Sequence, residues 1–180
     1  MDKNFFPGSE EEFQRYNQHN NTIENQGYVK FLNNFINTAQ LGKLKNVKKA
    51  LDFGCGPGPV LKILLGRMGI NTDIYDPYFF PDKIFANKKY DLITCTEVFE
   101  HLKEPYQTIE LLKSLLAPNG ILAVKTLFHT VCQDFSSWWY REDCTHFCFY
   151  SPKTFEWIGK NFELIMKNMD GHSICVFEKK

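Results

Sequence analysis

A glycine-rich turn that follows a short apolar run constrains the fold of this chain more than any other stretch. Residues 50–60 read Ala-Leu-Asp-Phe-Gly-Cys-Gly-Pro-Gly-Pro-Val, and a second carboxylate, Asp76, ends the next apolar run. Glycines at this spacing let the backbone approach a ligand closely and adopt positive φ at little cost. A carboxylate at the tip of the following strand can accept hydrogen bonds from both ribose hydroxyls. The segment therefore predicts a nucleoside pocket at the C-terminal edge of a parallel sheet.

Strand-like and helix-like segments alternate along the rest of the chain. This order predicts an α/β fold with a doubly wound, mostly parallel sheet and right-handed crossovers. Asp170-Gly171 is a hairpin-turn signal, so the C-terminal hairpin is expected to make one edge of the sheet antiparallel. The strands are expected over residues 47–53, 72–75, 91–96, 120–126, 162–169 and 173–179. The helices are expected over residues 59–68, 105–116 and 153–160, after an N-terminal helix that carries Tyr28, Phe31, Leu32, Phe35 and Ile36 at helical spacing.

The composition disfavours several kinds of partner. Lys plus Arg and Asp plus Glu number 21 each, so no net charge attracts nucleic acid or an anionic membrane. No apolar run reaches the roughly 18 residues that a membrane-spanning helix needs, and the N-terminus lacks the basic and apolar regions of a signal peptide. The six cysteines include no Cys-x-x-Cys pair, which favours the reducing cytoplasm. A length of 180 residues favours one domain and leaves the oligomeric state open.

The glycine spacing distinguishes two kinds of nucleoside pocket. The dinucleotide fingerprint needs a third glycine three residues after the second, whereas Gly58 comes too early here and is followed by Pro59. An NAD-dependent dehydrogenase is therefore the weaker interpretation. The pattern Asp52-x-Gly54-x-Gly56-x-Gly58 instead resembles the first motif of the class I S-adenosylmethionine (SAM)-dependent methyltransferases.

The resemblance to these methyltransferases extends from about residue 47 to the end of the chain. Residues 91–102 look like the family's fourth strand and the helix after it, and residues 116–120 look like the turn before its fifth strand. Residues 139–146 and 149–155 are similar to a segment of a small bacterial subgroup. Membership of that subgroup would also imply a helix over about residues 16–32.

The resemblance further implies how the chain is divided and which residues hold SAM. Residues 47–180 would form the SAM-binding α/β core of a single Rossmann-like domain, and residues 1–46 a helical lid. Tyr16 or His19 would bind the methionine carboxylate, whereas Asn21 or Thr22 is expected to cap the first long helix. The expected cofactor-binding residues are Asp52, Gly54, Cys55, Gly56, Gly58, Asp76, Pro77, Thr96, Tyr16 and His19.

One segment departs from the family pattern. Only 14 residues, 77–90, separate Asp76 from Asp91, where the full fold places a helix and a third strand. At about 3.3 Å per strand residue, little of both fits into that length. The third strand is therefore expected to be reduced or absent. Phe79, Phe80 and Phe85 are expected either to wall the adenine or simply to pack in the core.

A carboxylate and imidazole set follows the predicted strand over residues 91–96. Glu97, Glu100 and His101 are spaced i, i+3 and i+4, which places them on one face if the segment is helical. The set resembles metal sites of ubiquinone-pathway O-methyltransferases and small-RNA 2′-O-methyltransferases, and in the latter a further His completes the site. His146 is the nearest counterpart of that His, with His129 second. A metal site for Mg²⁺ or Mn²⁺ is one interpretation, and capping and packing is the other.

The stretch after the predicted strand over residues 120–126 offers further candidates. His146 is a candidate acid or base that Asp143 would orient. Cys144, His146 and Cys148 alternate and would share one face of a strand, which suggests either a zinc site or buried cysteines. Aromatic residues crowd the same stretch and are expected to form either a lid over the acceptor or a hydrophobic plug. They are Phe135, Trp138, Trp139, Tyr140, Phe147, Phe149 and Tyr150.

These features together predict a SAM-dependent methyltransferase that acts on a small molecule. Thr96 and Glu97 would border the transferred methyl group, and the expected catalytic residues are His146, Asp143 and Glu97. O-methylation is favoured over N-methylation because acidic and imidazole groups gather where a hydroxyl would need deprotonation. The alternative is a SAM- or nucleoside-binding regulatory module without catalysis, which the short chain and reduced third strand would fit.

Overall fold

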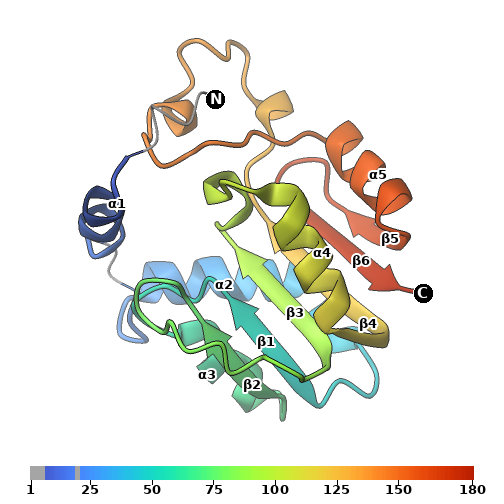
Figure 1. The fold of residues 1–180 in the computed structure, drawn as a ribbon. Coiled ribbons are helices and arrows are strands. Elements are labelled where there is room, and N and C mark those ends of the chain that lie inside the picture. The colour runs from blue at the N-terminus through green and yellow to red at the C-terminus, as the bar shows by residue number, and fades with distance from the viewer. Residues whose placement is uncertain (1–6, 19–20) are drawn as a thin grey trace.

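Six strands form one sheet with helices on both faces in the computed structural model, which describes residues 7–18 and 21–180 (Figure 1). His19, an expected cofactor-binding residue, lies outside the described residues. The strands are β1 (Lys49–Phe53), β2 (Asn71–Tyr75), β3 (Tyr90–Thr96), β4 (Leu116–Lys125), β5 (Leu164–Met169) and β6 (Ile174–Lys179). The α-helices are α1 (Ser9–Tyr16), α2 (Gln26–Thr38), α3 (Val60–Arg67), α4 (Pro105–Leu115) and α5 (Pro152–Asn161). Short 3-10 turns cover Leu41–Lys43, Phe99–His101, His129–Val131 and Trp139–Arg141.

The strand order is β2-β1-β3-β4-β6-β5. The first four strands pair in parallel, and β6 pairs antiparallel with both β4 and β5. The predicted mostly parallel sheet with an antiparallel C-terminal hairpin is therefore confirmed. Strand β4 begins four residues earlier than expected because buried Leu116 already pairs with Tyr90. The register then shifts across residues 117–120 of β4, and pairing resumes between Leu92 and Ile121.

The segment between β2 and β3 contains no strand among its residues, all of which the structure describes. Asp76 and Phe80 exchange backbone hydrogen bonds of 3.1 and 3.0 Å and close a tight turn directly after β2. Phe85 is buried against Phe53 and Tyr75, with ring centroids 6.2 and 5.0 Å apart. The expected loss of the third strand is confirmed, and the segment instead anchors one aromatic side chain in the core.

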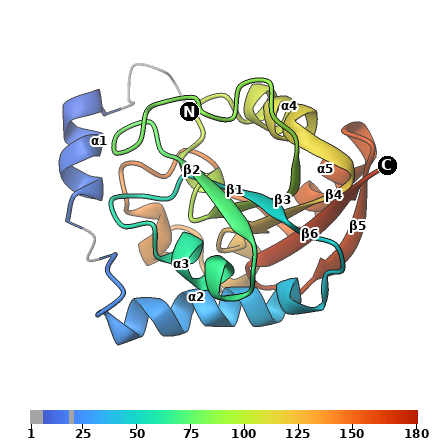
Figure 2. The ribbon, with the colours of Figure 1, turned by 90° about the horizontal axis from the view of Figure 1, so that it is seen from below.

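Two hydrophobic clusters lie on opposite faces of the sheet. Alternate strand residues supply both clusters, because successive side chains of a strand point to opposite faces: Ile93 and Cys95 belong to one cluster and Leu92 to the other. Helices α4 and α5 cover the first face, and α2 and α3 cover the second (Figure 2). This three-layer packing leaves the C-terminal ends of the parallel strands free to form a site.

The N-terminal segment contains two helices where one was expected. Helix α1 ends at Tyr16, and α2 begins at Gln26 with Asn25 as its N-cap, whose side chain accepts a 3.2 Å hydrogen bond from the Tyr28 N–H. The predicted caps Asn21 and Thr22 are therefore wrong. Helix α2 buries an apolar face against the sheet, whereas α1 stands beside the C-terminal ends of β1 and β3 (Figure 1).

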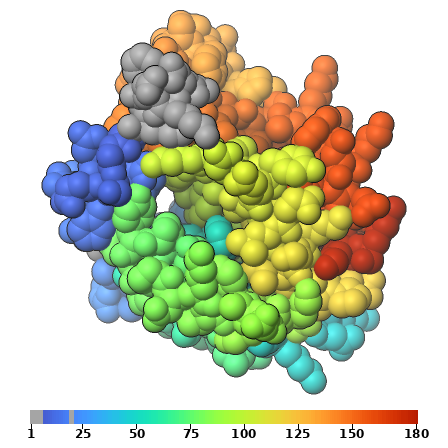
Figure 3. Space-filling view, in the orientation of Figure 1, coloured from blue at the N-terminus to red at the C-terminus, as the bar shows by residue number. Residues whose placement is uncertain are grey.

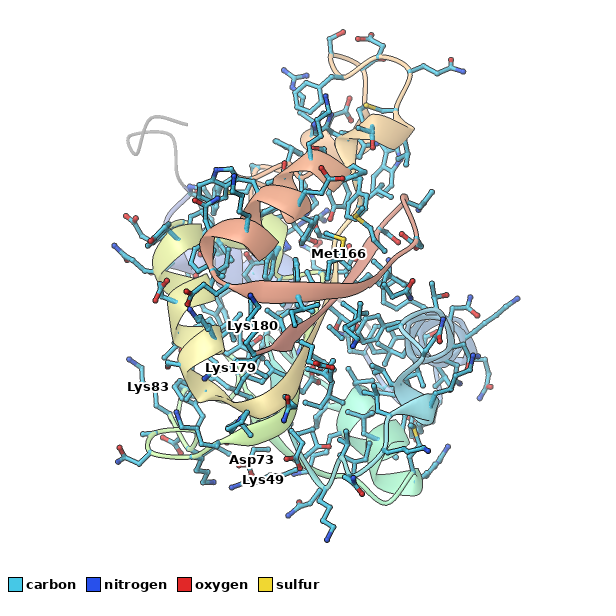
Figure 4. The ribbon with its side chains drawn as sticks, turned by 90° about the vertical axis from the view of Figure 1, so that its right-hand side faces the viewer. Lys49, Asp73, Lys83, Met166, Lys179 and Lys180 are labelled. Carbon is cyan, nitrogen blue, oxygen red and sulfur yellow. The ribbon has the colours of Figure 1, made fainter. Side chains whose placement is uncertain are left out.

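Lysine side chains stabilise the sheet at two places away from the C-terminal ends of the parallel strands. Lys179, at the end of β6, donates to the carbonyl oxygens of Lys113 and Leu116 over 2.9 and 3.0 Å and so places a cation at the C-terminus of α4 (Figure 4). Asp73 of β2, at the other end of the strand order, accepts from Lys88 over 2.9 Å. Across residues 7–18 and 21–180, no helix has both the length and the apolar character that crossing a bilayer requires.

Candidate active site

A cavity of about 590 Å³ lies at the C-terminal edge of the parallel strands. It is bounded by α1, the glycine turn and the ends of β1, β2 and β3, and Figure 3 shows a hollow between α1, in blue, and the green residues after β2. Seven of the expected cofactor-binding residues line it: Tyr16, Gly54, Cys55, Gly56, Asp76, Pro77 and Thr96. Asp52 and Gly58 lie beside the cavity without lining it.

The glycine turn has the backbone that its sequence predicts. Gly54 and Gly56 have φ values of 82° and 66°, in the region where residues with a Cβ are strained. The N–H groups of Gly54 and Cys55 both donate to the carbonyl of Tyr75, over 2.7 and 3.1 Å, and so join the turn to the end of β2. A Cβ added at Gly54 would lie 2.3 Å from Cγ2 of Val98, so this position also requires glycine for space.

Gly58 and Asp52 shape the turn from outside the cavity. A Cβ at Gly58 would lie 1.6 Å from the carbonyl oxygen of Asn21, so the N-terminal segment passes directly over the turn. Asp52 is buried and accepts a 2.9 Å hydrogen bond from the Thr94 hydroxyl. Burial raises the pKa of Asp52 to about 7. Asn21, expected only as a helix cap, lines the cavity.

Asp76 directly follows β2, and backbone N–H groups hold its carboxylate. Oδ2 accepts from Gly56 over 3.0 Å, and Oδ1 accepts from Tyr78 and Phe79 over 2.9 and 3.2 Å. Because each carboxylate oxygen can accept two hydrogen bonds, capacity remains for a ribose hydroxyl. Phe79 lines the cavity, so it is the one of the three expected phenylalanines placed to wall a base. The other two, Phe80 and Phe85, do not line it.

Helix α1 contributes a buried carboxylate that sequence reasoning missed. Glu12 lines the cavity with 4 % exposure, accepts a hydrogen bond from the Tyr78 hydroxyl and pairs with Lys103 over 2.6 Å. Tyr16, one turn later, lies with its hydroxyl 3.2 Å from His101 Nδ1. The only sequence signal for Glu12 is a run of three acidic residues, which by itself predicts an exposed helix face.

Glu97 lies at the tip of β3 in a turn, not on a helix. Its φ is 53°, and the 3-10 turn begins only at Phe99, so the expected helical face shared with Glu100 and His101 does not exist. The Glu97 carboxylate pairs with Lys125 over 3.1 Å. Burial, aided by the charge of Glu100, raises the pKa of Glu97 to about 7 although 37 % of its side chain is exposed.

Glu100, His101 and His146 converge in space. One ligand atom from each lies within 4.8 Å of the others, and the two imidazole centroids are 4.7 Å apart. His101 Nδ1 contacts the Thr145 carbonyl over 2.9 Å, and His146 Nδ1 contacts the Tyr140 carbonyl over 2.6 Å. Since a carbonyl can only accept, each Nδ1 carries a proton and each Nε2 keeps a lone pair. Glu97 lies outside this cluster, which corrects the expected four-residue set.

The buried environment sets the charge of the cluster. Glu100 is fully buried, burial raises its pKa, and its Oε2 has no hydrogen-bond partner among the described residues. Burial, followed by the neighbouring His101, lowers the pKa of His146. A neutral imidazole is the form that accepts a proton or binds a cation.

Asp143 does not orient His146 with its side chain, contrary to expectation. Its carboxylate accepts from Thr145 and from Arg15, and only its backbone carbonyl contacts the His146 N–H, over 3.0 Å. Burial acts to raise the pKa of Asp143, but these hydrogen bonds hold it well below its ordinary value. A strongly acidic, fully occupied carboxylate is a poor proton acceptor.

The zinc and lid interpretations of the same stretch find no geometric support. Residues 144–148 form no strand, Cys144 is exposed, and the Cys148 thiol contacts the Leu102 carbonyl. Trp138 is buried against Tyr140, with ring centroids 5.0 Å apart. None of the seven aromatic residues lines the cavity. Trp138, Tyr140 and Tyr150 are buried, whereas Phe135 and Trp139 are exposed, so only part of the set packs as a plug.

Comparison with known proteins agrees with this geometry. A family profile described as a methyltransferase domain matches residues 26–166. The chain therefore belongs to the class I SAM-dependent methyltransferase family. A ubiquinone biosynthesis O-methyltransferase of Glaesserella parasuis is 28 % identical over 110 residues, which cover 46 % of this methyltransferase chain and 47 % of the relative. A similar protein from Histophilus somni is 26 % identical over 118 residues, 51 % of this chain and 48 % of the relative. The chain thus spans about half the length of the curated relatives it matches.

Solved structures share the fold of this methyltransferase at low identity. An O-methyltransferase family protein from Burkholderia thailandensis has a TM-score of 0.58 at 10 % identity, with 92 % of this chain and 62 % of that chain covered. The phosphoethanolamine N-methyltransferase 2 of Haemonchus contortus, solved in complex with SAM, has a TM-score of 0.56 at 16 % identity over 76 % of this chain and 38 % of that chain. These likenesses support the Rossmann-like methyltransferase fold alone.

Proposed function

We propose that this chain binds SAM in the cavity and transfers its methyl group to a hydroxyl of a small-molecule acceptor. The cluster of Glu100, His101 and His146 beside the cavity is the observation that carries the proposal. Methyl transfer from a sulfonium needs mainly alignment and exclusion of water, whereas a hydroxyl acceptor also needs a group that takes its proton. The relatives named as O-methyltransferases support the same choice of acceptor atom.

The cavity fits the donor. SAM, when bound, supplies a methyl group already activated by positive sulfur. The positive φ of Gly54 and Gly56 bends the turn along the cavity wall, and Asp76 follows the neighbouring strand where a ribose needs an acceptor. Tyr16 and Asn21 also line the cavity with polar groups, and we assign them to the methionine part of the donor.

His101 is the imidazole placed to take the acceptor's proton, because it lines the cavity while His146 lies behind it. Its Nδ1–H donates to the Thr145 carbonyl, so Nε2 is the nitrogen that carries the lone pair, 4.0 Å from Glu100 Oε1. Glu97 is a second candidate, since a pKa of about 7 suits a base at neutral pH. Asp143 is assigned a supporting role only.

The same cluster also fits a divalent cation. Glu100 has a buried carboxylate oxygen without a partner, and both imidazoles donate from Nδ1 to backbone carbonyls, as metal-binding histidines commonly do. Two nitrogen ligands favour Mn²⁺ over Mg²⁺. Such an ion would lower the pKa of an acceptor hydroxyl.

The six free thiols are consistent with a protein that functions in the reducing cytoplasm.

A direct assay tests the proposal. The chain is incubated with SAM and a panel of phenols, catechols and matched aromatic amines, with and without Mn²⁺, and S-adenosylhomocysteine (SAH) is measured by mass spectrometry. SAH is expected with hydroxyl acceptors, and His101→Gln should lower kcat by about 100-fold. His172→Gln, at an exposed position, is the matched control. Transfer to amines alone, or equal turnover by the two variants, would overturn the proposal.

A regulatory module that binds SAM without catalysis is the second candidate, and the missing third strand is the observation that favours it. Calorimetry separates the two. Tight SAM binding with no SAH formed from any acceptor, or from a cell extract, would support the module.

A further inference from the structure

An ion pair joins α1 to the loop before α5, far away in sequence. Nε and Nη2 of Arg15 donate to Oδ2 of Asp143 over 3.0 and 2.8 Å. The Arg15 side chain is 47 % exposed and that of Asp143 16 % exposed, and neither residue lines the cavity. Two hydrogen bonds to one carboxylate give the pair more directional strength than a simple contact of charges.

The other oxygen of Asp143 organises the turn over residues 143–146. This turn carries His146 and contacts His101. Oδ1 accepts from the N–H and the hydroxyl of Thr145 over 3.0 and 2.6 Å, and the Asp143 carbonyl accepts from the His146 N–H over 3.0 Å. The Thr145 carbonyl in turn contacts His101 Nδ1 over 2.9 Å. A continuous series of polar contacts therefore runs from Arg15 through Asp143 and Thr145 to the imidazoles.

The inner side of α1 faces the donor part of the cavity. Glu12 accepts from the Tyr78 hydroxyl, and the Tyr78 N–H donates to Asp76, the expected ribose-binding carboxylate. Tyr16 of the same helix lines the cavity. One two-turn helix thus contacts the donor pocket on one side and, through Arg15, the acceptor-side turn on the other.

We propose that Arg15 is a positioning residue that transmits donor binding to His101 and His146. The inference rests on the proposed function, because it needs a donor in the cavity. A donor that contacts Glu12 and Tyr16 fixes α1, which fixes Arg15 on Asp143 and thereby the turn that carries Thr145. Thermodynamic linkage makes this effect reciprocal. If donor binding strengthens the Arg15–Asp143 contact, that contact strengthens donor binding by the same free energy. Arg15 itself touches neither donor nor acceptor.

The test uses SAH as the probe and the His146 imidazole as the reporter. His146 does not line the cavity, so a change in its ring ¹⁵N signals on SAH addition reports transmission within the protein. The signals are assigned from the spectrum of His146→Gln. Arg15→Gln and Arg15→Lys are compared with Arg67→Gln, a matched control at an exposed position on α3. Melting curves confirm that every variant is folded.

The wild type and Arg67→Gln should show the same His146 response to SAH. Arg15→Gln should lose at least half of it and bind SAH about threefold more weakly, as expected for a partly exposed ion pair, and Arg15→Lys should lie between. A His146 response in Arg15→Gln equal to that of Arg67→Gln would overturn the inference alone. Failure of SAH to bind the wild type would instead overturn the proposed function, and this inference with it.

Discussion

The Tyr140 hydroxyl donates to Oε1 of Glu100 over 2.6 Å and lies 3.3 Å from Oε2 of Glu97. One buried phenol therefore serves two carboxylates, both with a pKa raised by burial. Burial and the two negative charges raise the pKa of Tyr140 as well, so it keeps its proton and remains a donor. Without the Tyr140 hydroxyl, the Glu97 and Glu100 carboxylates would lose a hydrogen-bond donor that offsets their mutual repulsion.

Replacing Tyr140 by Phe should destabilise the protein without changing its packing much. The variant leaves the buried Oε1 of Glu100 without this hydrogen bond, which typically costs about 1–3 kcal/mol. Urea unfolding measures the change, with Tyr106→Phe as the control because Tyr106 is 58 % exposed. The control should stay within about 0.5 kcal/mol of the wild type. Equal unfolding midpoints for the two variants would contradict the assigned role of the phenol.

Alanine at Gly54 should be far more harmful than alanine at another glycine. Its Cβ would meet Val98 at 2.3 Å on a backbone with φ of 82°, so the free energy of unfolding should fall by about 1–3 kcal/mol and SAH binding should weaken. Gly66 in α3 has nothing within 4 Å of an added Cβ. Gly66→Ala should therefore raise stability by about 0.5 kcal/mol, through better helix propensity. Thermal melts with and without SAH compare the two variants, and a Gly54→Ala variant as stable as the wild type would refute the assignment.

The sheet was predictable because its signals are local. The glycine turn, the apolar runs and the Asp170-Gly171 turn each lie within a few residues, and each specifies its own element. Glu100 and His101 were found as a pair for the same reason. Their expected helix was wrong because Glu97 adopts a left-handed backbone that residue spacing does not reveal.

The contacts that α1 makes across long sequence separations could not be predicted. Arg15 and Asp143 are 128 residues apart, and nothing in either neighbourhood indicates the other. Glu12 is buried only because Tyr78 and Lys103 reach it from two other segments. The sequence therefore indicates the glycine turn that would hold the donor, but it does not indicate the ion pairs of α1.

The buried Asp52 should make stability depend on pH. Its folded pKa of about 7 lies above the ordinary 3.8, mainly because of burial, so between these values the folded state holds a proton that the unfolded chain releases. Raising the pH through this window must then lower the free energy of unfolding, by at most about 1.4 kcal/mol per pH unit from this group. Asp52→Asn removes the titration, so its stability relative to the wild type should grow from pH 4.5 to 7 and level off above. Denaturation at a series of pH values measures this, with exposed Asp82→Asn as control, and a constant difference for Asp52→Asn would refute it.

Asp76 should decide the affinity for the donor. Its carboxylate accepts from Gly56, Tyr78 and Phe79 and so holds the glycine turn against the segment after β2. Asp76→Ala loses these three hydrogen bonds as well as the ribose acceptor. Asp76→Asn keeps one carbonyl oxygen, so its affinity for the donor should lie between those of the wild type and Asp76→Ala. Ligand at 100 times its Kd adds about 2.7 kcal/mol to the stability of the folded state, so the gain in melting temperature with SAH reads out affinity. The gain should vanish in Asp76→Ala and persist in Asp82→Ala, which changes an exposed carboxylate six residues later. An undiminished gain in Asp76→Ala would mean that the donor does not use the carboxylate that follows β2.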